Sequence, residues 1–220
     1  MALGLVLGCW QWNRAAEKEA YLSALAAAPA LIAPREAPPA GARLTLEGTY
    51  LAGETRFLDN RTHGRQLGVA VLTPLRTSDG RLWLIERGFL ATGTSRDAPT
   101  VATPMGPVTI KGQWQPDGQR APLFGDNQEG VRLQRIQLDA WEHLGDFAHA
   151  GWLHLEEGPG GLAPWWEPSV MPPSRHLGYA VQWWGLAAAA LLVMWWGGRR
   201  LRHGPQATNN GMSRSKESLP

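Results

Sequence analysis

The segment from Leu177 to Gly198 constrains the fold most, because it contains no Asp, Glu, Lys, Arg or His. As a helix it spans about 30 Å, the thickness of the hydrocarbon core of a bilayer. Tryptophan pairs stand near its two ends, as aromatic belts at membrane interfaces do, at Trp183–Trp184 and Trp195–Trp196. The alternative is a buried helix of a soluble protein, but such helices are rarely so long and uncharged. We therefore predict a transmembrane helix over residues 175–198.

The charges beside this segment predict its orientation. Three arginines follow it closely, Arg199, Arg200 and Arg202, and cytoplasmic flanks of membrane helices are rich in Lys and Arg. Residues 199–220 are therefore expected to form a disordered cytoplasmic tail, with the preceding domain on the other side of the membrane. Acidic residues slightly outnumber basic ones between Arg14 and Ser174. The excess of positive charge thus lies near the ends of the chain and reflects its orientation in the membrane. We therefore expect no nucleic-acid partner.

The N-terminus is apolar from Met1 to Trp12 and then meets Arg14. This stretch is too short to span a bilayer and lacks the positive start and cleavage site of a signal peptide. We interpret residues 1–13 as the outer half of a transmembrane helix that is truncated; the alternative is a short interfacial anchor. Residues 14–42 are expected to continue as a helix to about Pro29 and then as a Pro/Ala linker.

From Arg43 onward the apolar residues alternate with a period of two, which is typical of strands. The turn residues Ser78–Gly80 separate two apolar runs and predict a central hairpin, with strands at Gln66–Leu72 and Arg81–Leu90. Other strands are predicted at Arg43–Leu51, Thr55–Arg61, Val108–Pro116, Val131–Trp141 and Gly151–Glu157, with a short helical piece near Asp139–His149. Residues 43–174 should therefore form a mostly β external domain, a barrel or small sandwich of about six to seven strands.

Two of these strands share a pattern in which a glycine precedes an aromatic residue by two positions. It occurs at Thr45–Tyr50 and again at Thr109–Trp114. A shared bulge geometry would explain the similarity, and chance is the alternative.

No catalytic motif is present in the sequence. It contains no GxSxG, HExxH, CxxC or glycine-rich phosphate loop, so we do not expect an enzyme. Cys9 is the only cysteine, which excludes an internal disulfide. The histidines of the β domain are expected at the surface or in loops. A metal site of His143, His149 and His154 is the alternative, but a spacing of six does not stack the first two on one helical turn.

His176 differs from the other histidines, because it stands beside Arg175 and directly before the uncharged segment. His176, Tyr179 and Trp183 follow the i, i+3, i+7 spacing of one helical stripe. Such a group suits haem: imidazole binds the iron, the aromatic rings contact the macrocycle, and the guanidinium pairs with a propionate. The alternative is that His176 and Arg175 simply mark the membrane boundary.

Several blocks of the sequence, in the same order, resemble the surfeit locus protein 1 family, whose members are assembly factors of cytochrome c oxidase. The first is Leu7–Leu22, which carries the pattern Gly-x-Trp-Gln-x-x-Arg. The others are Glu47–Leu51, Leu58–Arg61, Gly68–Leu90 and Arg175–Ala187. The resemblance covers the chain from about Gly4 to Gly198. It implies two transmembrane helices that bracket an external, largely β domain, and it supports a truncated first helix.

The resemblance also implies a function. The chain is expected to help mature subunit I of haem–copper oxidases by delivering haem a or aiding its insertion, with His176 as the iron ligand and Tyr179, Trp183 and Arg175 lining the site. Subunit I, the haem a synthesis machinery and the lipid bilayer are the implied partners. The implied location is the bacterial inner membrane, with the β domain in the periplasm.

Other positions match the family outside this site. In the β domain, Gly88 is expected to meet a backbone requirement and Arg87 to be structural or to face a partner; Asn60 and Arg61 also match. The residues of the first block that match are expected to pack on the second helix near His176: Trp10, Gln11 and Arg14. Two alternatives stay open, a scaffold that grips an oxidase subunit without binding haem, and an anchored envelope enzyme.

Overall fold

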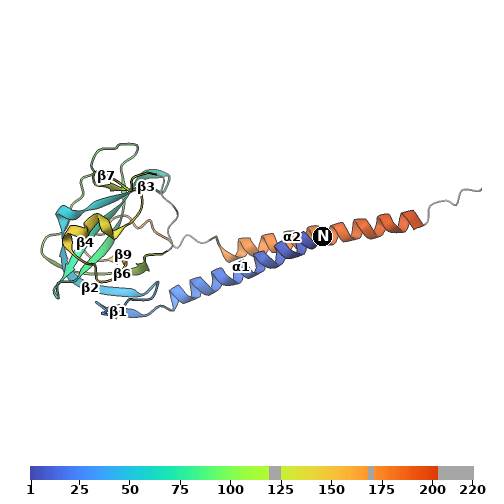
Figure 1. Cartoon of the computed structure of the whole chain (residues 1–220), viewed down its shortest axis with the longest axis horizontal. Coiled ribbons are helices and arrows are strands. Elements are labelled where there is room, and N and C mark those ends of the chain that lie inside the picture. The colour runs from blue at the N-terminus through green and yellow to red at the C-terminus, as the bar shows by residue number, and fades with distance from the viewer. Residues whose placement is uncertain (119–124, 168–170, 203–220) are drawn as a thin grey trace, which may run out of the picture. The chain divides into compact units, whose positions relative to one another are not determined.

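The chain folds into two helices and a β domain, as a computed structural model that describes residues 1–118, 125–167 and 171–202 shows (Figure 1). Helix α1 covers Ala2–Ala26 and helix α2 covers Pro173–Arg202. The structure divides into two compact units: the first 19 residues belong with α2, and Ala20–Ser169 form the β domain. The predicted tail beyond residue 202 lies outside the described residues.

Within the described part of the chain, α2 alone is long and apolar enough to cross a membrane, over Pro173–Arg200. It begins at a proline, which the first turn of a helix accepts because that turn needs no backbone N–H donor. It continues past the predicted boundary at residue 198, since arginine is a good helix former. Helix α1 does not meet the same criterion, because charged residues begin at Arg14. Its predicted membrane-spanning role therefore stays a proposal.

In the residues that the structure describes, the β domain contains nine strands in one sheet, of which six are long. The long strands are β2 (Arg43–Tyr50), β3 (Arg56–His63), β4 (Gln66–Thr77), β5 (Leu82–Ala91), β6 (Pro107–Pro116) and β9 (Gly151–Glu157). The short strands are β1 (Ala30–Ile32), β7 (Gln128–Glu129) and β8 (Arg132–Leu133), and two 3₁₀ segments cover Ala52–Glu54 and Leu138–Leu144.

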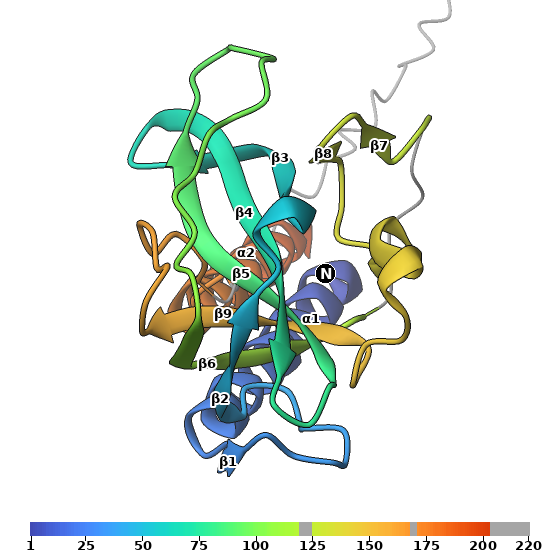
Figure 2. The same ribbon diagram turned by 90° about the vertical axis from the view of Figure 1, so that its left-hand side faces the viewer.

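Five of the strands close into a barrel (Figure 2). Their order is β2–β6–β9–β5–β4, and β4 returns to pair with β2 through Gly48 opposite Thr77. All neighbours are antiparallel except β5 and β9, which run parallel. The mostly β domain is thus confirmed, and of the two predicted architectures, barrel or small sandwich, the structure shows the barrel. Closure also removes the open edges that strands of an unclosed sheet would expose.

The central hairpin is confirmed, because β4 pairs with β5 along its length and eight consecutive residues of β5 are buried, from Leu82 to Phe89. The strand predicted over Val131–Trp141 is wrong in length: only Arg132–Leu133 is extended. The segment instead buries Leu133, Ile136 and Trp141, whose spacing is not that of a strand. The helical piece predicted near Asp139–His149 is the 3₁₀ segment Leu138–Leu144.

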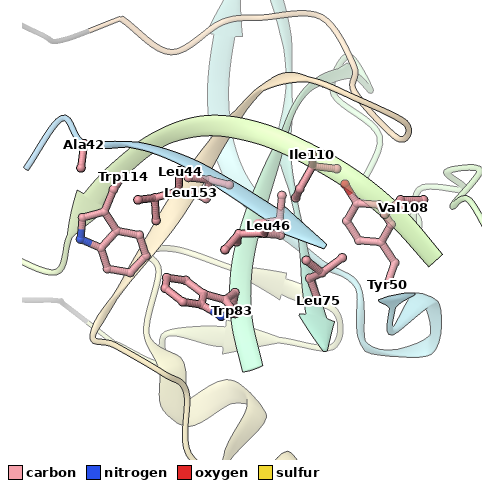
Figure 3. Packing of buried hydrophobic residues seen from close by; sticks show 11 residues of the cluster. Ala42, Leu44, Leu46, Tyr50, Leu75, Trp83, Val108, Ile110, Trp114 and Leu153 are labelled. Atoms are coloured by element: carbon pink, nitrogen blue, oxygen red, sulfur yellow. The ribbon is translucent and has the colours of Figure 1, made fainter. Parts of the chain in front are cut away.

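The barrel interior is an apolar cluster in which alternate residues of β2 meet β4, β5, β6 and β9 (Figure 3). Leu44 and Leu46 are fully buried, and the rings of Trp83 and Trp114 meet edge to face with centroids 5.7 Å apart. Edge-to-face packing is a preferred arrangement of aromatic rings and adds to the stabilisation from burial.

The two matching glycines occupy equivalent tight places. A Cβ at Gly48 would come within 2.4 Å of the Arg76 carbonyl oxygen, and one at Gly112 within 2.1 Å of the His154 carbonyl oxygen. Each glycine therefore lets its strand approach the backbone of the next strand in the barrel, and at Gly112 the register shifts as in a bulge.

Tyr50 gives a testable pH dependence. Its hydroxyl donates to the Pro159 carbonyl at 3.1 Å, and burial, opposed by the charge of Arg87, raises its pKa to about 12. An unfolded tyrosine has a pKa of about 10, so above that pH the folded state retains a proton that the unfolded chain loses. Stability that is fully present below about pH 10 should therefore decrease as pH rises to about 12.

Urea unfolding between about pH 9 and about pH 12 measures this effect. Tyr50→Phe should make the free energy of unfolding decline less steeply with pH, whereas Tyr21→Phe, at an exposed tyrosine, should leave the slope unchanged. If the free energy of unfolding declines equally steeply with pH in the unmodified protein and in both variants, the pH dependence does not come from Tyr50.

Candidate functional site

Small residues allow α1 and α2 to pack closely (Figure 1). A Cβ at Gly4 would lie 3.1 Å from the Ala187 Cβ, and one at Gly8 would overlap the Trp184 indole, 2.2 Å from its Nε1. Trp184 also meets Trp12, with ring centroids 6.0 Å apart. The two helices run antiparallel, since Gly4 meets Ala187 while Gln11 meets His176. In a bilayer such close contact is a main source of helix association.

This packing buries His176 against α1. The residue is 8% exposed, and its Nδ1 lies 2.7 Å from Oε1 of Gln11. Because an amide oxygen only accepts, Nδ1 carries a proton, and in the neutral imidazole Nε2 then has the free lone pair. Within the described residues no hydrogen-bond partner of Nε2 is found. The geometry is that of an imidazole held in one tautomer, with a nitrogen left to act as a ligand.

The other residues predicted near His176 lie differently. Tyr179 is 47% exposed and Arg175 is also exposed, while Trp183 is half-buried. On α1, Trp10 is exposed and Arg14 forms an exposed ion pair with Glu17 at 2.8 Å. Of the first block, therefore, Gln11 is the residue that the structure brings to His176.

In the β domain, the block Leu58–Arg61 forms a bulge in β3. The register with β4 shifts between Leu58 and Arg61, and Asn60 adopts a left-handed backbone with φ of 56°. Asparagine tolerates this conformation better than most residues. The predicted Asn60 is exposed and reaches Gln134 at 3.4 Å, and Arg61 donates from Nε to the Asp59 carbonyl at 2.9 Å.

The bulge directs the neighbouring Asp59, which sequence analysis did not single out, into a buried ion pair. Its Oδ1 accepts from Arg132 at 2.9 Å and its Oδ2 accepts from Arg96. Arg132 also donates to the carbonyls of Ser95 and Asp97. Asp59 therefore ties β3 to β8 and to the loop before β6.

Arg87 and Gly88 fasten other loops to β5. Arg87 is 1% exposed and donates to the carbonyls of Gly160 (2.8 Å) and Ala102 (2.6 Å), which is the geometry of a structural residue. Burial lowers its pKa, and the charge of Tyr50 opposes this shift. Gly88 has φ of 119°, and a Cβ there would come within 2.8 Å of the Ala163 carbonyl oxygen.

The three histidines of the alternative metal site have separate partners. His143 pairs with Glu54 at 3.0 Å, His149 lies against Trp83, and His154 binds Glu86. Among the described residues, no group of three or more His, Cys, Asp or Glu is arranged to hold a metal. The expectation of a surface or loop position is wrong for His154, which is 6% exposed on β9 and points to Glu86 of the neighbouring strand β5.

The fold and the helix pair define a membrane-associated protein with a closed β barrel and one buried histidine at the start of its apolar helix. The family model described as the SURF1 family matches residues 1–188, and the chain belongs to this family. The resemblance seen in the sequence is thereby confirmed. The family is associated with the assembly of cytochrome oxidase. A comparison with curated proteins found no match.

Proposed function

We propose that this protein is a non-enzymatic assembly factor that holds haem a at His176 and aids its insertion into subunit I of cytochrome oxidase. The observation that carries the proposal is the 2.7 Å hydrogen bond between His176 Nδ1 and Gln11 Oε1. Metal-ligating histidines usually donate their second ring N–H to an oxygen acceptor, which fixes the ring and raises its basicity. Gln11 supplies that acceptor and leaves Nε2 as the ligand.

The donor set fits haem a as cargo. Imidazole is a common axial ligand of haem iron, which His176 would bind through Nε2. Arg175 is exposed and would pair with a propionate, and Tyr179 and Trp183 offer aromatic surface to the macrocycle. Because His176 is only 8% exposed, loading requires side chains around it to move.

We also propose a topology and partners for this function. The guanidinium groups of Arg199 and Arg200 lie over Trp195 and Trp196, at 4.6 and 4.5 Å, as an interfacial belt with adjacent positive charge would. This supports a cytoplasmic C-terminal end of α2 and a periplasmic β domain in a bacterial inner membrane. Helix α1 would be the second membrane helix, and subunit I and the haem a synthesis machinery would be the partners.

Expression in a strain that makes haem a tests the proposal. The protein purified in detergent should carry the haem a absorption band, and deletion of its gene should lower the amount of assembled oxidase. A colourless protein whose deletion still impairs assembly would instead support the scaffold that grips a subunit without haem. A colourless protein with normal assembly in the deletion strain would contradict both functions.

A further inference from the structure

A cavity of about 340 Å³ opens in the β domain beside the buried pair of Glu86 and His154. Two consecutive tryptophans, Trp165 and Trp166, line the cavity, and so does Glu156. Pockets for small ligands begin at about 300 Å³, so this cavity has room for one long side chain. It lies on strands β5, β6 and β9 and involves none of the residues proposed to hold haem.

Hydrogen bonds hold the tryptophan wall in place. The Leu162 N–H donates to the Arg87 carbonyl at 2.8 Å, and the Phe89 N–H donates to the Ala163 carbonyl at 2.8 Å. The segment before the indoles thus lies against β5 like an added strand. The Trp165 indole N–H then donates to Glu86 at 2.8 Å, so the cavity is formed before any ligand binds.

The hydrogen bonds also determine the charge at the cavity. The Trp152 Nε1–H donates to His154 Nε2 at 3.2 Å, which requires that nitrogen to be unprotonated. In the tautomer that accepts this bond, His154 donates from Nδ1 to Glu86 Oε2 at 2.6 Å. Glu86 is 2% exposed, and in the described residues no Lys or Arg forms an ion pair with it. A buried carboxyl group whose hydrogen-bond donors include no Lys or Arg among the described residues thus lies at the wall of the cavity.

Glu86 still has capacity to accept a hydrogen bond. Its Oε1 accepts from the Gly88 N–H (2.9 Å) and from Trp165, and its Oε2 accepts from His154. A carboxylate offers about four acceptor sites, so about one remains, on Oε2. Glu156 is exposed at the cavity, and the described residues give its carboxylate no partner. These two carboxylates and the adjacent indoles create a strong preference for a cation.

One contact at the cavity shows that the ring of Trp165 accepts a cation as a neighbour. The Arg61 guanidinium lies 5.8 Å from the centroid of Trp165, and the Trp166 ring stacks on His154 with centroids 3.8 Å apart. Arg61 forms no ion pair with Glu86 among the described residues, but burial lowers the pKa of Arg61 and the charges of Asp59 and Glu86 oppose this shift, so Arg61 offsets part of the Glu86 charge. One remaining acceptor site on Glu86 suits a compact ammonium better than the two-pronged guanidinium of arginine.

We propose that this cavity binds a primary alkylammonium group and that its occupant is a lysine side chain of a partner polypeptide. The ammonium would be attracted by the charges of Glu86 and Glu156, and its alkyl chain would lie along Trp165 and Trp166. A lysine side chain also matches the volume, which leaves no room for a folded element. The β domain would then grip its partner at a defined residue.

Fluorine NMR of the full chain in detergent, labelled with fluorotryptophan, tests this proposal. Trp165→Phe and Trp166→Phe identify the two resonances. Titration with n-butylammonium and with the peptide acetyl-Gly-Lys-Gly-amide should move both resonances saturably, and the peptide should bind more tightly. Equal shifts with n-pentanol, which is uncharged, would overturn the proposal. An arginine peptide that binds as well as the lysine peptide would overturn the choice of ammonium, and tighter binding of free butylammonium would overturn the polypeptide source.

Two variants locate the binding site without removing the buried pair. Glu156→Gln should weaken binding of the lysine peptide about twofold to fivefold, as expected for an exposed charge pair. Trp166→Leu should weaken it about threefold to tenfold through loss of the cation–π contact. Glu157→Gln is the matched control, because the carboxylate of Glu157 pairs with Lys111 and does not line the cavity. If Glu156→Gln and Glu157→Gln have the same effect, the assignment is wrong.

Discussion

Replacing His176 by alanine should abolish the haem a absorption band of the purified protein and lower the amount of assembled oxidase. The physical reason is that Nε2 of this ring is the proposed iron ligand and that alanine offers no replacement. The loss should occur without unfolding of the β domain, because His176 packs in the helix unit and not in the barrel core. Visible absorption and circular dichroism of the same sample separate the two effects.

Gln11 is a positioning residue for this ligand and allows a finer test. Gln11→Leu removes the acceptor of the His176 Nδ1 proton, and loss of such a partner typically weakens metal binding about 10-fold to 100-fold. Gln11→Glu restores an acceptor and should recover binding with a lowered haem reduction potential, since a carboxylate makes the imidazole a stronger donor. His143→Ala, at an exposed histidine of the β domain, is the matched control. Unchanged affinity and potential in both Gln11 variants would refute the role of Gln11.

Replacing Asp59 by alanine should lower the free energy of unfolding of the β domain by about 3–5 kcal/mol. The side chains of Asp59 and Arg132 are 6% and 5% exposed, so the change leaves a buried guanidinium without its counterion. Urea unfolding followed by tryptophan fluorescence measures the loss. Asp139→Ala, at an exposed carboxylate of the β domain, should change the free energy of unfolding little.

A second replacement tests whether the loss of stability in Asp59→Ala comes from the unpaired charge of Arg132. Asp59→Ala combined with Arg132→Met should be more stable than Asp59→Ala alone, because the apolar pair no longer buries an uncompensated charge. A double variant as unstable as the single one would contradict this explanation.

The carboxylate of Asp59 should also make the free energy of unfolding decrease in acid. Burial raises the pKa of Asp59, but hydrogen bonds from Arg96 and the Asn60 N–H and the charges of Arg132 and Arg96 outweigh it, so the pKa lies below 3.8. The stabilisation is therefore present above that ordinary value and is lost as pH falls through the lowered one. Asp59→Asn should remove the part of the pH dependence of the free energy of unfolding that comes from this carboxylate.

Local patterns were sufficient to predict most strands and the membrane helix. The Ser78–Gly80 turn and the apolar runs beside it predict the β4–β5 hairpin, since these signals lie within a few residues of each other. The absence of charge predicts α2 in the same way. The prediction of a strand over Val131–Trp141 was wrong because an apolar run does not distinguish an extended segment from a 3₁₀ turn that covers the core.

Long-range partners could not be predicted. Glu86 and His154 are 68 residues apart, and the parallel pairing of β5 with β9 brings them together. No sequence spacing records that pairing, so His154 was expected at the surface although its strand was predicted. Gln11 and His176 are 165 residues apart and were associated only through the family blocks. Asp59 was overlooked although it lies in the Leu58–Arg61 block, because a bulge decides which of its residues points inward.

The place of β9 in the barrel has a consequence for the order of events during synthesis. β9 ends at Glu157 and hydrogen-bonds to both β5 and β6. The other neighbours of these two strands, β4 and β2, are synthesised much earlier. Until the ribosome has produced this last strand, a growing chain exposes two unsatisfied strand edges and the apolar face between them. Such edges are where nascent β proteins associate wrongly. For the proposed periplasmic β domain, a holding chaperone on that side of the membrane would therefore affect the yield of this protein most before β9 has crossed.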